Sequence, residues 1–402
     1  MGLRHRFNLI PRNNWDYGLG ALFVALAGVR NDAAHAPNVE NVFQQKPLWT
    51  SSGRTSLYAI LKSLELPARS KIGVPLYCCS VVFNAIRQAG LSPRFIDSNT
   101  NDGNISIEDL RKKRPELAAV IAVHMFGNPC DMDAVNTVAG AIPVIEDCAQ
   151  SIFSAYKGKQ TGCLSTASFF SFRCGKYISA GEGSAIFCTE PELQKRIERL
   201  VNTFENWSTL KMSIHSLLTF VKAALYNRPW YGLIGYPIGR RLDKKLNLTA
   251  KEGFEVKKIA PVHLALIDAR IGQFQKKISL QREHAQVLLN ALAPGSFNLP
   301  SESDRCSSNW YQFALRFQNT SQRDAMASFL FAHGIDTAKY LDDIANEARI
   351  DYGYNGDCPN AERLAKTVLL VPIHYTLSTR DIDHIVRSIN EGSQIIRNAA
   401  GH

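Results

Sequence analysis

The alternation of apolar runs with helical patterns limits most strongly how this chain of 402 residues can fold. From about residue 50, short apolar runs at 71–76, 118–126 and 142–147 alternate with segments whose apolar residues recur at helical spacing. The last two runs are apolar throughout, which is typical of strands buried on both faces of a parallel sheet. We therefore predict an α/β fold with a mainly parallel sheet flanked by helices, followed by a small α+β domain.

Local patterns place the individual elements of the first half. We expect helices over 54–64, 79–90, 106–114 and 192–203, and strands over 71–76, 93–97, 118–126 and 142–147. Ser106 and Asp109 have capping-box spacing at the start of the third helix. The apolar stretch at 17–29 begins too far from the start for a typical secretory signal, so we expect a core or surface helix there.

The alternating pattern breaks after residue 203. Residues 205–255 are first apolar and aromatic and then basic, with Arg240, Arg241, Lys244 and Lys245 in the basic part. A long helix is expected over 263–293, followed by a strand at 309–317, a helix at 321–332, a strand at 367–373 and a final helix from Ser378. We expect a large domain over residues 1–255, including 205–255 as an unusual insertion, and a small domain over residues 256–402.

Composition excludes several classes of protein. The nine cysteines are odd in number and form no CxxC pair, which argues against a disulfide framework and a structural zinc site. Reduced thiols in the cytoplasm are the simplest account, and we expect no metal. The formal charge of +10 suits anionic ligands, nucleic acid or an anionic membrane surface, but no nucleic-acid-binding motif is visible. No apolar run reaches the roughly eighteen residues that a spanning helix needs.

Polar residues follow the ends of several predicted strands. Because the carboxyl ends of parallel strands meet at one edge of a sheet, we expect these side chains to share one crevice. They are His124, Glu146, Asp147, Gln150, Ser171 and Lys176. The small residues around Gly53 begin a helix, whose free N–H groups form an anion site.

A carboxylate, a lysine and a phosphate site are what pyridoxal phosphate requires. The lysine forms a Schiff base with the aldehyde, and the carboxylate keeps the pyridine nitrogen protonated so that the ring can act as an electron sink. Taken alone, Lys176 could be a solvated loop lysine and Asp147 a helix cap. His124 could stack on the cofactor or be an ordinary histidine at the end of a strand.

Six motifs in order resemble the DegT/StrS family of nucleotide-sugar aminotransferases, which are fold-type-I pyridoxal phosphate enzymes. They are SSGRTSLYAIL, VPLYCCSVVFNAI, VHMFGNPCDMDAV, VIEDCAQS, SFFSFRCGKYISAGEGSAI and VPIHYTLSTRDIDHIV. The resemblance implies transfer of an amino group from glutamate or glutamine to a keto-sugar on a nucleotide carrier, and the unusual insertion adds a lipid carrier as a possibility. The resemblance also implies a homodimer and a role in surface polysaccharide or amino-sugar biosynthesis.

The resemblance assigns roles to residues by position. Lys176 would be the Schiff-base lysine and proton shuttle, and Asp147 would pair with the pyridine nitrogen. Gln150 would lie near the hydroxyl side of the ring, and Ser171 would hold the phosphate. The remaining predicted cofactor contacts are the backbone groups of Arg54 and Thr55, together with Cys79 and His124.

The chain departs from the family pattern at three positions. Arg54 replaces the third residue of the usual SGTA loop, which backbone donation to phosphate would survive. Cys79 occupies the position of an aromatic residue that often stacks on the cofactor, and Tyr77 is the nearest aromatic residue. Pro261 stands where the family has an asparagine that reaches the partner subunit's site, and proline has neither a side-chain amide nor an N–H.

Alternatives remain for the insertion and for the activity. Residues 205–255 could cap the substrate pocket or add dimer contacts, or they could rest on an anionic membrane, because Trp207, Trp230 and basic residues occur with apolar ones. A sugar dehydratase using the same cofactor is a second possible activity, although such relatives replace the lysine with histidine. A cofactor-binding sensor or inactive scaffold is the third interpretation.

Overall fold

The computed structural model describes residues 6–28, 35–239, 253–293 and 295–400. Its main feature is a seven-stranded sheet in the order β1-β9-β8-β5-β4-β2-β3. The strands are β1 (Leu48–Thr50), β2 (Lys71–Pro75), β3 (Ser92–Ile96), β4 (Leu117–Val123), β5 (Val144–Asp147), β8 (Ala167–Ser171) and β9 (Ser184–Cys188). Five neighbouring strands, from β3 to β8, pair in parallel, whereas β9 is antiparallel to both β8 and β1. The predicted mainly parallel sheet is confirmed, and the reversed strand β9 was not predicted.

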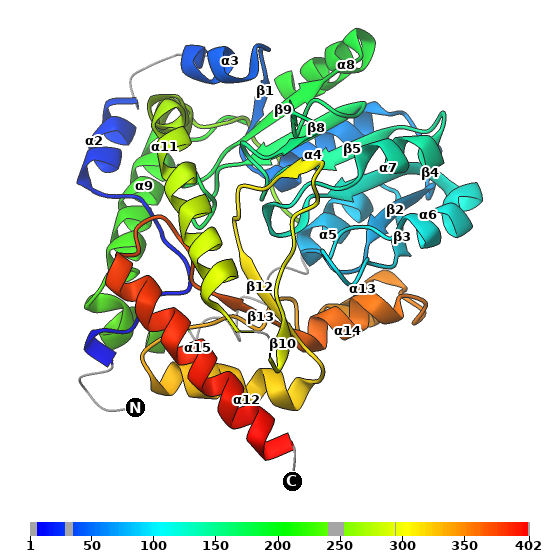
Figure 1. Cartoon of the computed structure of the whole chain (residues 1–402). Coiled ribbons are helices and arrows are strands. Elements are labelled where there is room, and N and C mark those ends of the chain that lie inside the picture. The colour runs from blue at the N-terminus through cyan, green and yellow to red at the C-terminus, as the bar shows by residue number, and fades with distance from the viewer. Residues whose placement is uncertain (1–5, 29–34, 240–252, 294, 401–402) are drawn as a thin grey trace.

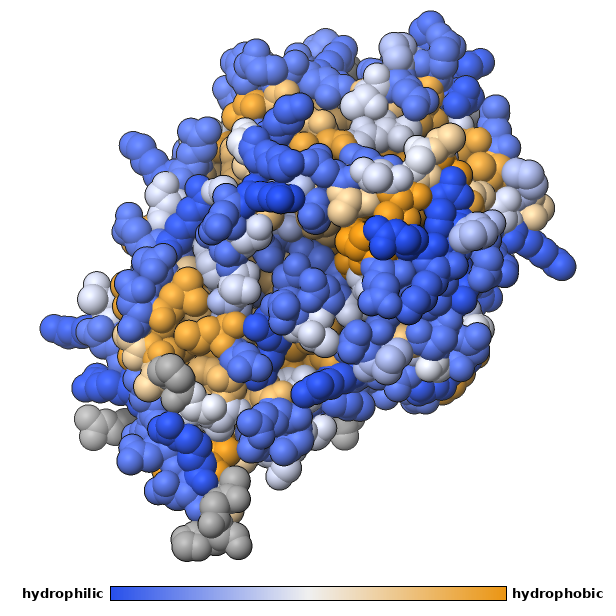
Figure 2. All heavy atoms as spheres, turned by 45° about the vertical axis from the view of Figure 1, so that its right-hand side comes forward, coloured by the Kyte–Doolittle hydropathy of each residue, from blue (hydrophilic) through white to orange (hydrophobic). Residues whose placement is uncertain are grey.

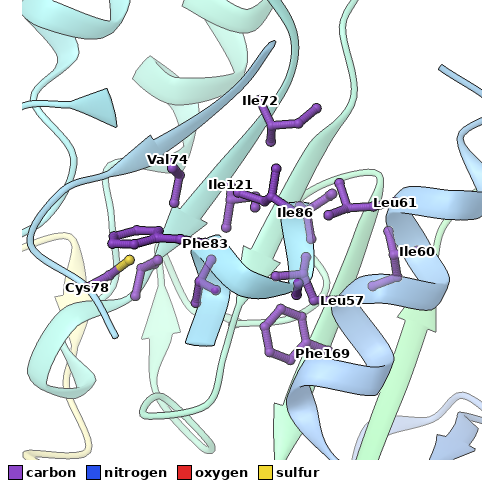
Figure 3. Packing of buried hydrophobic residues seen from close by; sticks show 14 of the residues in the cluster. Leu57, Ile60, Leu61, Ile72, Val74, Cys78, Phe83, Ile86, Ile121 and Phe169 are labelled. Carbon is purple, nitrogen blue, oxygen red and sulfur yellow. The ribbon is translucent and has the colours of Figure 1, made fainter. Parts of the chain in front are cut away.

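Helices cover the sheet on both sides (Figure 1). They include α4 (Gly53–Ser63), α5 (Ser80–Gln88), α6 (Ile107–Lys113), α7 (Met132–Ala139) and α8 (Pro191–Asn202). The Ser106 hydroxyl accepts a hydrogen bond from the Asp109 N–H at 3.3 Å, as the predicted cap requires. Figure 3 shows where α4, α5 and β2 bury their apolar faces together, through Leu57, Ile60, Leu61, Ile72, Val74, Phe83 and Ile86. This packed core fixes the start of α4 beside the ends of the strands.

The C-terminal part contains a second, smaller sheet in the order β10-β12-β13, which is antiparallel throughout. Its strands are β10 (Phe297–Asn298), β12 (Phe313–Phe317) and β13 (Val368–Val371). The helices are α11 (Pro261–Ala291), α12 (Thr320–Ala332), α13 (Ile344–Tyr352), α14 (Pro359–Thr367) and α15 (Thr379–Ala400). A short sheet of β6 (Ala155–Tyr156), β7 (Lys159–Gln160) and β11 (Cys306–Ser307) links the two parts.

The N-terminal segment crosses to the C-terminal part of the chain. The Ile10 N–H donates to Gly334 O at 2.8 Å, and Ile10 O accepts from the Asp336 N–H at 3.0 Å. The Ile10 side chain is buried in the same apolar cluster as the small sheet. Residues near the N-terminus therefore pack with the predicted small domain, and the division at residue 256 stays a prediction.

Two surface helices have exposed apolar faces. They are α2 (Leu19–Gly28), which lies in the stretch predicted as a helix, and α9 (Thr209–Leu225) in the insertion. In Figure 1 both lie on the same side as α11, and α2 contacts both α9 and α11. The insertion continues through a cis peptide bond at Arg228–Pro229 into a π-helical turn at Tyr231–Gly235. Its predicted basic stretch at 240–245 lies outside the described residues.

The rest of the surface has the mixture of polar and apolar residues that is usual for a folded protein. On the face shown in Figure 2, hydrophilic residues cover most of the molecule and hydrophobic residues lie in patches between them. None of the helices in the described ranges is both long and apolar enough to span a bilayer. All nine cysteines are free thiols, and five of them are buried, whereas Cys79 and Cys163 are exposed.

Candidate active site

The beginning of α4 meets the end of β8. Ser52 caps the helix, because its hydroxyl accepts the Thr55 N–H at 3.3 Å. Gly53 lies so close to β8 that a Cβ on it would be 3.4 Å from the Ser171 Cβ. A helix N-terminus beside a serine hydroxyl is suited to hold a phosphate group. The structure thus brings together the predicted phosphate-binding residues Ser171, Arg54 and Thr55.

The start of α4 is fixed by a buried chain of hydroxyl groups. The Thr50 and Ser56 hydroxyls are 2.8 Å apart, and the Ser56 hydroxyl donates to the Ser184 hydroxyl at 2.7 Å. These three residues join β1, α4 and β9, and all three are buried. Small hydroxyl residues at these positions therefore lock the helix against the two antiparallel strands at this side of the sheet.

Lys176 lies in the turn after β8 and is partly buried. Its Nζ is 5.4 Å from the centroid of the Tyr311 ring, whose hydroxyl donates to Gly175 O at 2.6 Å. Gly175 has a φ of 88°, a conformation that favours glycine, so the turn that presents the lysine depends on it. Burial lowers the pKa of Lys176, although the Asp147 carboxylate opposes that change.

Asp147 is the last residue of β5 and is only 6% exposed. Its Oδ1 accepts the Ala149 N–H at 3.0 Å. Burial raises the pKa of the Asp147 carboxyl, and the Ala149 N–H and the Lys176 charge act in the opposite direction. The Asp147 carboxylate and the Lys176 amine are therefore close enough for each charge to affect the pKa of the other group.

Gln150 is held between the two parts of the chain. Its Oε1 accepts the Phe126 N–H at 3.0 Å, and its Nε2 donates to the Tyr340 hydroxyl at 3.2 Å. Its backbone carbonyl accepts the Asn309 side-chain amide at 2.9 Å. The amide is buried and fixed in orientation, and its contact with the cofactor stays a prediction.

His124 is fully buried, and both of its ring nitrogens have protein partners. Nδ1 accepts the Cys130 N–H at 3.0 Å, so the proton is on Nε2, which donates to Glu146 Oε2 at 3.1 Å. Glu146 also accepts the N–H groups of Gly162 and Leu164, each at 2.8 Å. This network satisfies both ring nitrogens of a fully buried side chain, so the contact of His124 with a cofactor stays a prediction.

Cys79 and Arg54 lie at the starts of two helices, Cys79 at the N-cap of α5 and Arg54 in the first turn of α4. Cys79 is exposed at the N-terminus of α5 and acts on the pKa values of both Lys176 and Arg54. Burial lowers the pKa of Arg54, whereas the Glu182 carboxylate raises it. The Arg54 guanidinium also lies 5.2 Å from the centroid of the Phe254 ring. Pro261 is the first residue of α11, a position that suits proline.

Lys176 lines a cavity of about 560 Å³. Several lining residues were not predicted from the sequence, among them Arg12, Trp15, Arg173, Tyr226, Tyr311 and Lys339. His374 also lines it, and burial lowers the pKa of His374 to about 4. Among the described residues of this wall, four side chains are cationic and none is a carboxylate, so the cavity suits an anionic ligand.

The reversed strand at one side of the sheet and the lysine turn after β8 define the class of fold-type-I aminotransferases. Residues 43–390 match the DegT/DnrJ/EryC1/StrS aminotransferase family. The chain belongs to this family and is an aminotransferase, which confirms the resemblance seen in the six motifs.

Known relatives cover most of the chain. GDP-perosamine synthase of Escherichia coli O157:H7 is 25% identical over 347 residues, which are 85% of this chain and 84% of that protein. GDP-perosamine synthase of Vibrio cholerae is 30% identical over 296 residues, covering 72% and 71% of the two chains. The crystal structure of the aminotransferase TlmJ from Streptoalloteichus hindustanus superposes with a TM-score of 0.76 at 20% identity, over 96% of this chain and 100% of that one. This last likeness concerns the fold alone.

Proposed function

We propose that this aminotransferase uses pyridoxal phosphate to transfer an amino group from glutamate or glutamine to a keto-sugar on a nucleotide carrier. The observation that carries the proposal is that Lys176 lies in the turn after β8 and lines a cation-rich cavity, while Ser171 at the end of the same strand meets the start of α4. The names of the two perosamine synthases support a nucleotide-linked sugar as the substrate. The reaction serves amino-sugar or surface polysaccharide biosynthesis in the cytoplasm.

The residues of the site fit the cofactor. When bound, pyridoxal phosphate supplies an electron sink for the substrate carbon. Lys176 would form the covalent bond to the aldehyde with release of water, and its lowered pKa would increase the fraction of the neutral amine that can attack. Asp147 holds the proton on the ring nitrogen, which gives its buried carboxylate a cationic partner.

The phosphate group has its own set of donors. The Ser171 hydroxyl and the free N–H groups at the start of α4 bind it, because Gly53 brings the helix to within contact of β8. Gln150, whose amide donates to the Tyr340 hydroxyl, would lie near the hydroxyl side of the ring. Cys79 and the face of His124 complete the proposed set of cofactor contacts.

Absorption spectroscopy tests this proposal. Purified protein supplied with pyridoxal phosphate should show a visible band that shifts on addition of glutamate, and Lys176→Ala should lose the band. A wild-type protein that gains no band with added cofactor would contradict the proposal. A band that responds to no amino donor would favour the sensor interpretation instead.

Retention of Lys176 separates this activity from the dehydratase alternative. An aminotransferase needs a lysine amine to move protons between carbon atoms, and Lys176 is present in the turn after β8. Mass spectrometry of the product decides between the two: a gain of the donor's amino nitrogen supports transfer, whereas loss of water without nitrogen uptake supports dehydration.

Residues 205–255 have features that fit both a cap over the substrate pocket and a membrane contact. Tyr226, at the end of α9, lines the cavity, as expected of a cap. The outward face of α9 carries Leu210, Ile214, Leu217, Leu218 and Val221, all exposed, whereas its buried residues are Met212, Ser216, Thr219 and Ala223. The more apolar face of this helix therefore points outward, which is the reverse of an ordinary surface helix.

We propose that this face of α9 rests on an anionic membrane. No acidic residue occurs between 206 and 239, and Lys211 and Lys222 lie on α9 itself, so the charge complements anionic lipid. Trp230 is 52% exposed and is available to the interface. Trp207 is not, because it packs on His263 and its indole N–H donates to Lys258 O at 3.1 Å.

A further inference from the structure

The turn that carries Lys176 lies beyond the residues through which β5 and β8 pair. Asp147 of β5 is opposite Phe169 of β8, and the Cys148 N–H donates to Phe169 O at 3.0 Å. Lys176 comes further along the chain, in the turn after Ser171, the last residue of β8. The pairing of the two strands therefore cannot by itself fix the lysine relative to the aspartate.

A short segment before β12 contacts this turn on both sides of Lys176. The Tyr311 hydroxyl donates to Gly175 O at 2.6 Å, and the Tyr177 hydroxyl donates to Asn309 O. The residue before the lysine and the residue after it are thus each hydrogen-bonded to the same segment. A buried hydrogen bond of this kind stabilises a structure by about 1 kcal/mol, so two of them restrain the turn.

Asn309 joins the same segment to the loop that follows Asp147. Its side-chain amide donates to Gln150 O and to Ile152 O, each at 2.9 Å. Its Oδ1 accepts the Tyr311 N–H at 2.9 Å, and the whole residue is buried. One segment from the C-terminal part of the chain therefore connects the loop after β5 to the turn after β8.

The two tyrosine hydroxyls are suited to hold the backbone rather than to exchange protons. Burial raises the pKa of both Tyr177 and Tyr311. Each hydroxyl therefore keeps its proton at neutral pH and stays a hydrogen-bond donor to the carbonyl that it contacts.

We propose that residues 309–311 are a positioning clamp, which holds the turn of Lys176 against the loop that follows Asp147. Asn309 and Tyr311 act through the backbone on either side of the lysine and are positioning residues. This inference rests on the proposed function, because it concerns how the lysine of the same site is oriented. Loss of a clamp hydrogen bond frees the turn to move toward the cavity, where water reaches the amine.

Acetylation of Lys176 in the full chain without cofactor tests the clamp. Only the neutral amine reacts with acetic anhydride, so the rate at Lys176, followed by mass spectrometry against pH, reports the pKa of this amine. Burial lowers that pKa, and release of the turn should return it toward the ordinary value of about 10.4. We expect the rate at about pH 8, divided by its alkaline plateau, to fall several-fold in Tyr311→Phe and in Tyr177→Phe.

Both variants remove a hydroxyl and leave the charges around the lysine in place. Phenylalanine at 311 keeps the ring, whose centroid lies 5.4 Å from Lys176 Nζ. The charged and titratable groups that act on the amine are Asp147, Cys79 and Arg173. Tyr156→Phe is the matched control, because Tyr156 is also buried and donates to Asp131 Oδ1 at 2.7 Å, and neither of these residues lines the cavity. Its profile should equal that of the wild type.

Two outcomes overturn the proposal. A wild-type profile in either Tyr311→Phe or Tyr177→Phe would show that the hydroxyl does not hold the turn. A fall in the pKa of Lys176 would show that the hydroxyl acts on the charge of the amine directly. The acetylation needs no cofactor, so it tests the clamp alone, whereas a wild type without the visible band of pyridoxal phosphate would contradict the proposed function.

Discussion

Trp15 stacks on Tyr226 with ring centroids 4.5 Å apart and ring planes 9° apart. Trp15 precedes α2, and Tyr226 follows α9, so the stack joins the N-terminal segment to the insertion. The Trp15 Nε1 would also lie 3.4 Å from a Cβ on Gly175, next to Lys176. Two segments that are distant in the sequence therefore form one wall of the cavity that Lys176 also lines.

Loss of this stack should affect substrate binding more than cofactor binding. Trp15→Ala removes a ring pair worth about 1 kcal/mol beyond its buried area and opens the wall. We expect KM for the keto-sugar to rise about tenfold while the visible cofactor band stays unchanged. Trp15→Phe keeps a stacking ring and should restore most of the affinity. A wild-type KM for Trp15→Ala would show that the stack is not part of the substrate site.

Asp147→Asn separates the charge of the carboxylate from its shape. Asparagine can still accept the Ala149 N–H through its side-chain oxygen, but it carries no negative charge for the ring nitrogen. We expect the rate of the half-reaction with glutamate to fall about 10²- to 10³-fold, measured by stopped-flow absorbance. Asp133→Asn, on the exposed face of α7, should react at the wild-type rate. A variant Asp147→Asn with wild-type kinetics would contradict the proposed role.

The insertion is tied to α15 by a bidentate ion pair. Arg228 donates to both oxygens of Asp381 at 2.8 and 2.7 Å, and Ser378 donates its N–H and its hydroxyl to Asp381 Oδ2. Burial alone would raise the pKa of Asp381, but these hydrogen bonds outweigh it and hold the pKa well below its usual value. We expect Asp381→Asn to lower the free energy of unfolding by about 2 kcal/mol at pH 7.

The direction of the Asp381 pKa shift determines how the loss of stability in Asp381→Asn depends on pH. Because the pKa of Asp381 is lower in the folded state, its stabilising effect is present above the unfolded value of about 3.9 and disappears as the pH falls through the folded value. Denaturant unfolding should therefore show the two proteins converging in strongly acidic solution. Asp383→Asn, an exposed carboxylate on the same helix, is the control and should match the wild type at every pH. A difference between wild type and Asp381→Asn that persists in acid would contradict this account.

Local signals predicted much of the fold. The Ser106 cap and the apolar strands β4 and β5 depend on residues that are neighbours in the chain, so short-range patterns were sufficient. The direction of β9 depends on which strand it pairs with, and no local pattern carries that information. The fold class could therefore be predicted, whereas the reversed strand had to be observed.

As with the fold, only part of the candidate active site could be predicted from the sequence. Strand ends and the six motifs indicated Lys176 and Asp147, and in the structure each of these residues affects the pKa of the other. The hydrogen bonds of His124 could not be read from the sequence, because they depend on how the Cys130 loop folds back. The contribution of Arg12 to the cavity depends on the long return of the N-terminus to the C-terminal part, which tertiary packing alone decides.

The outward face of α9 gives the last prediction. Liposome flotation at moderate salt should carry the wild type with anionic vesicles and less with zwitterionic ones, because apolar burial and lysine charge act together. The double variant Leu217→Gln and Leu218→Gln should float several-fold less, since both side chains are more than half exposed in the wild type. Ile350→Gln removes an equally exposed apolar side chain on α13 and should leave flotation unchanged.

The oligomeric state of the same proteins shows whether the outward face of α9 contacts a membrane or a second copy of the chain. If α9 rests on lipid, light scattering should give the same mass for the wild type and for the Leu217→Gln, Leu218→Gln protein, whatever that mass is. A wild type that ignores anionic vesicles, together with a variant of half the wild-type mass, would show that this face is covered by the partner subunit. Binding to the vesicles through lysine charge alone, without apolar contact, gives a different result. In that case high salt would abolish flotation of the wild type and of the variant alike.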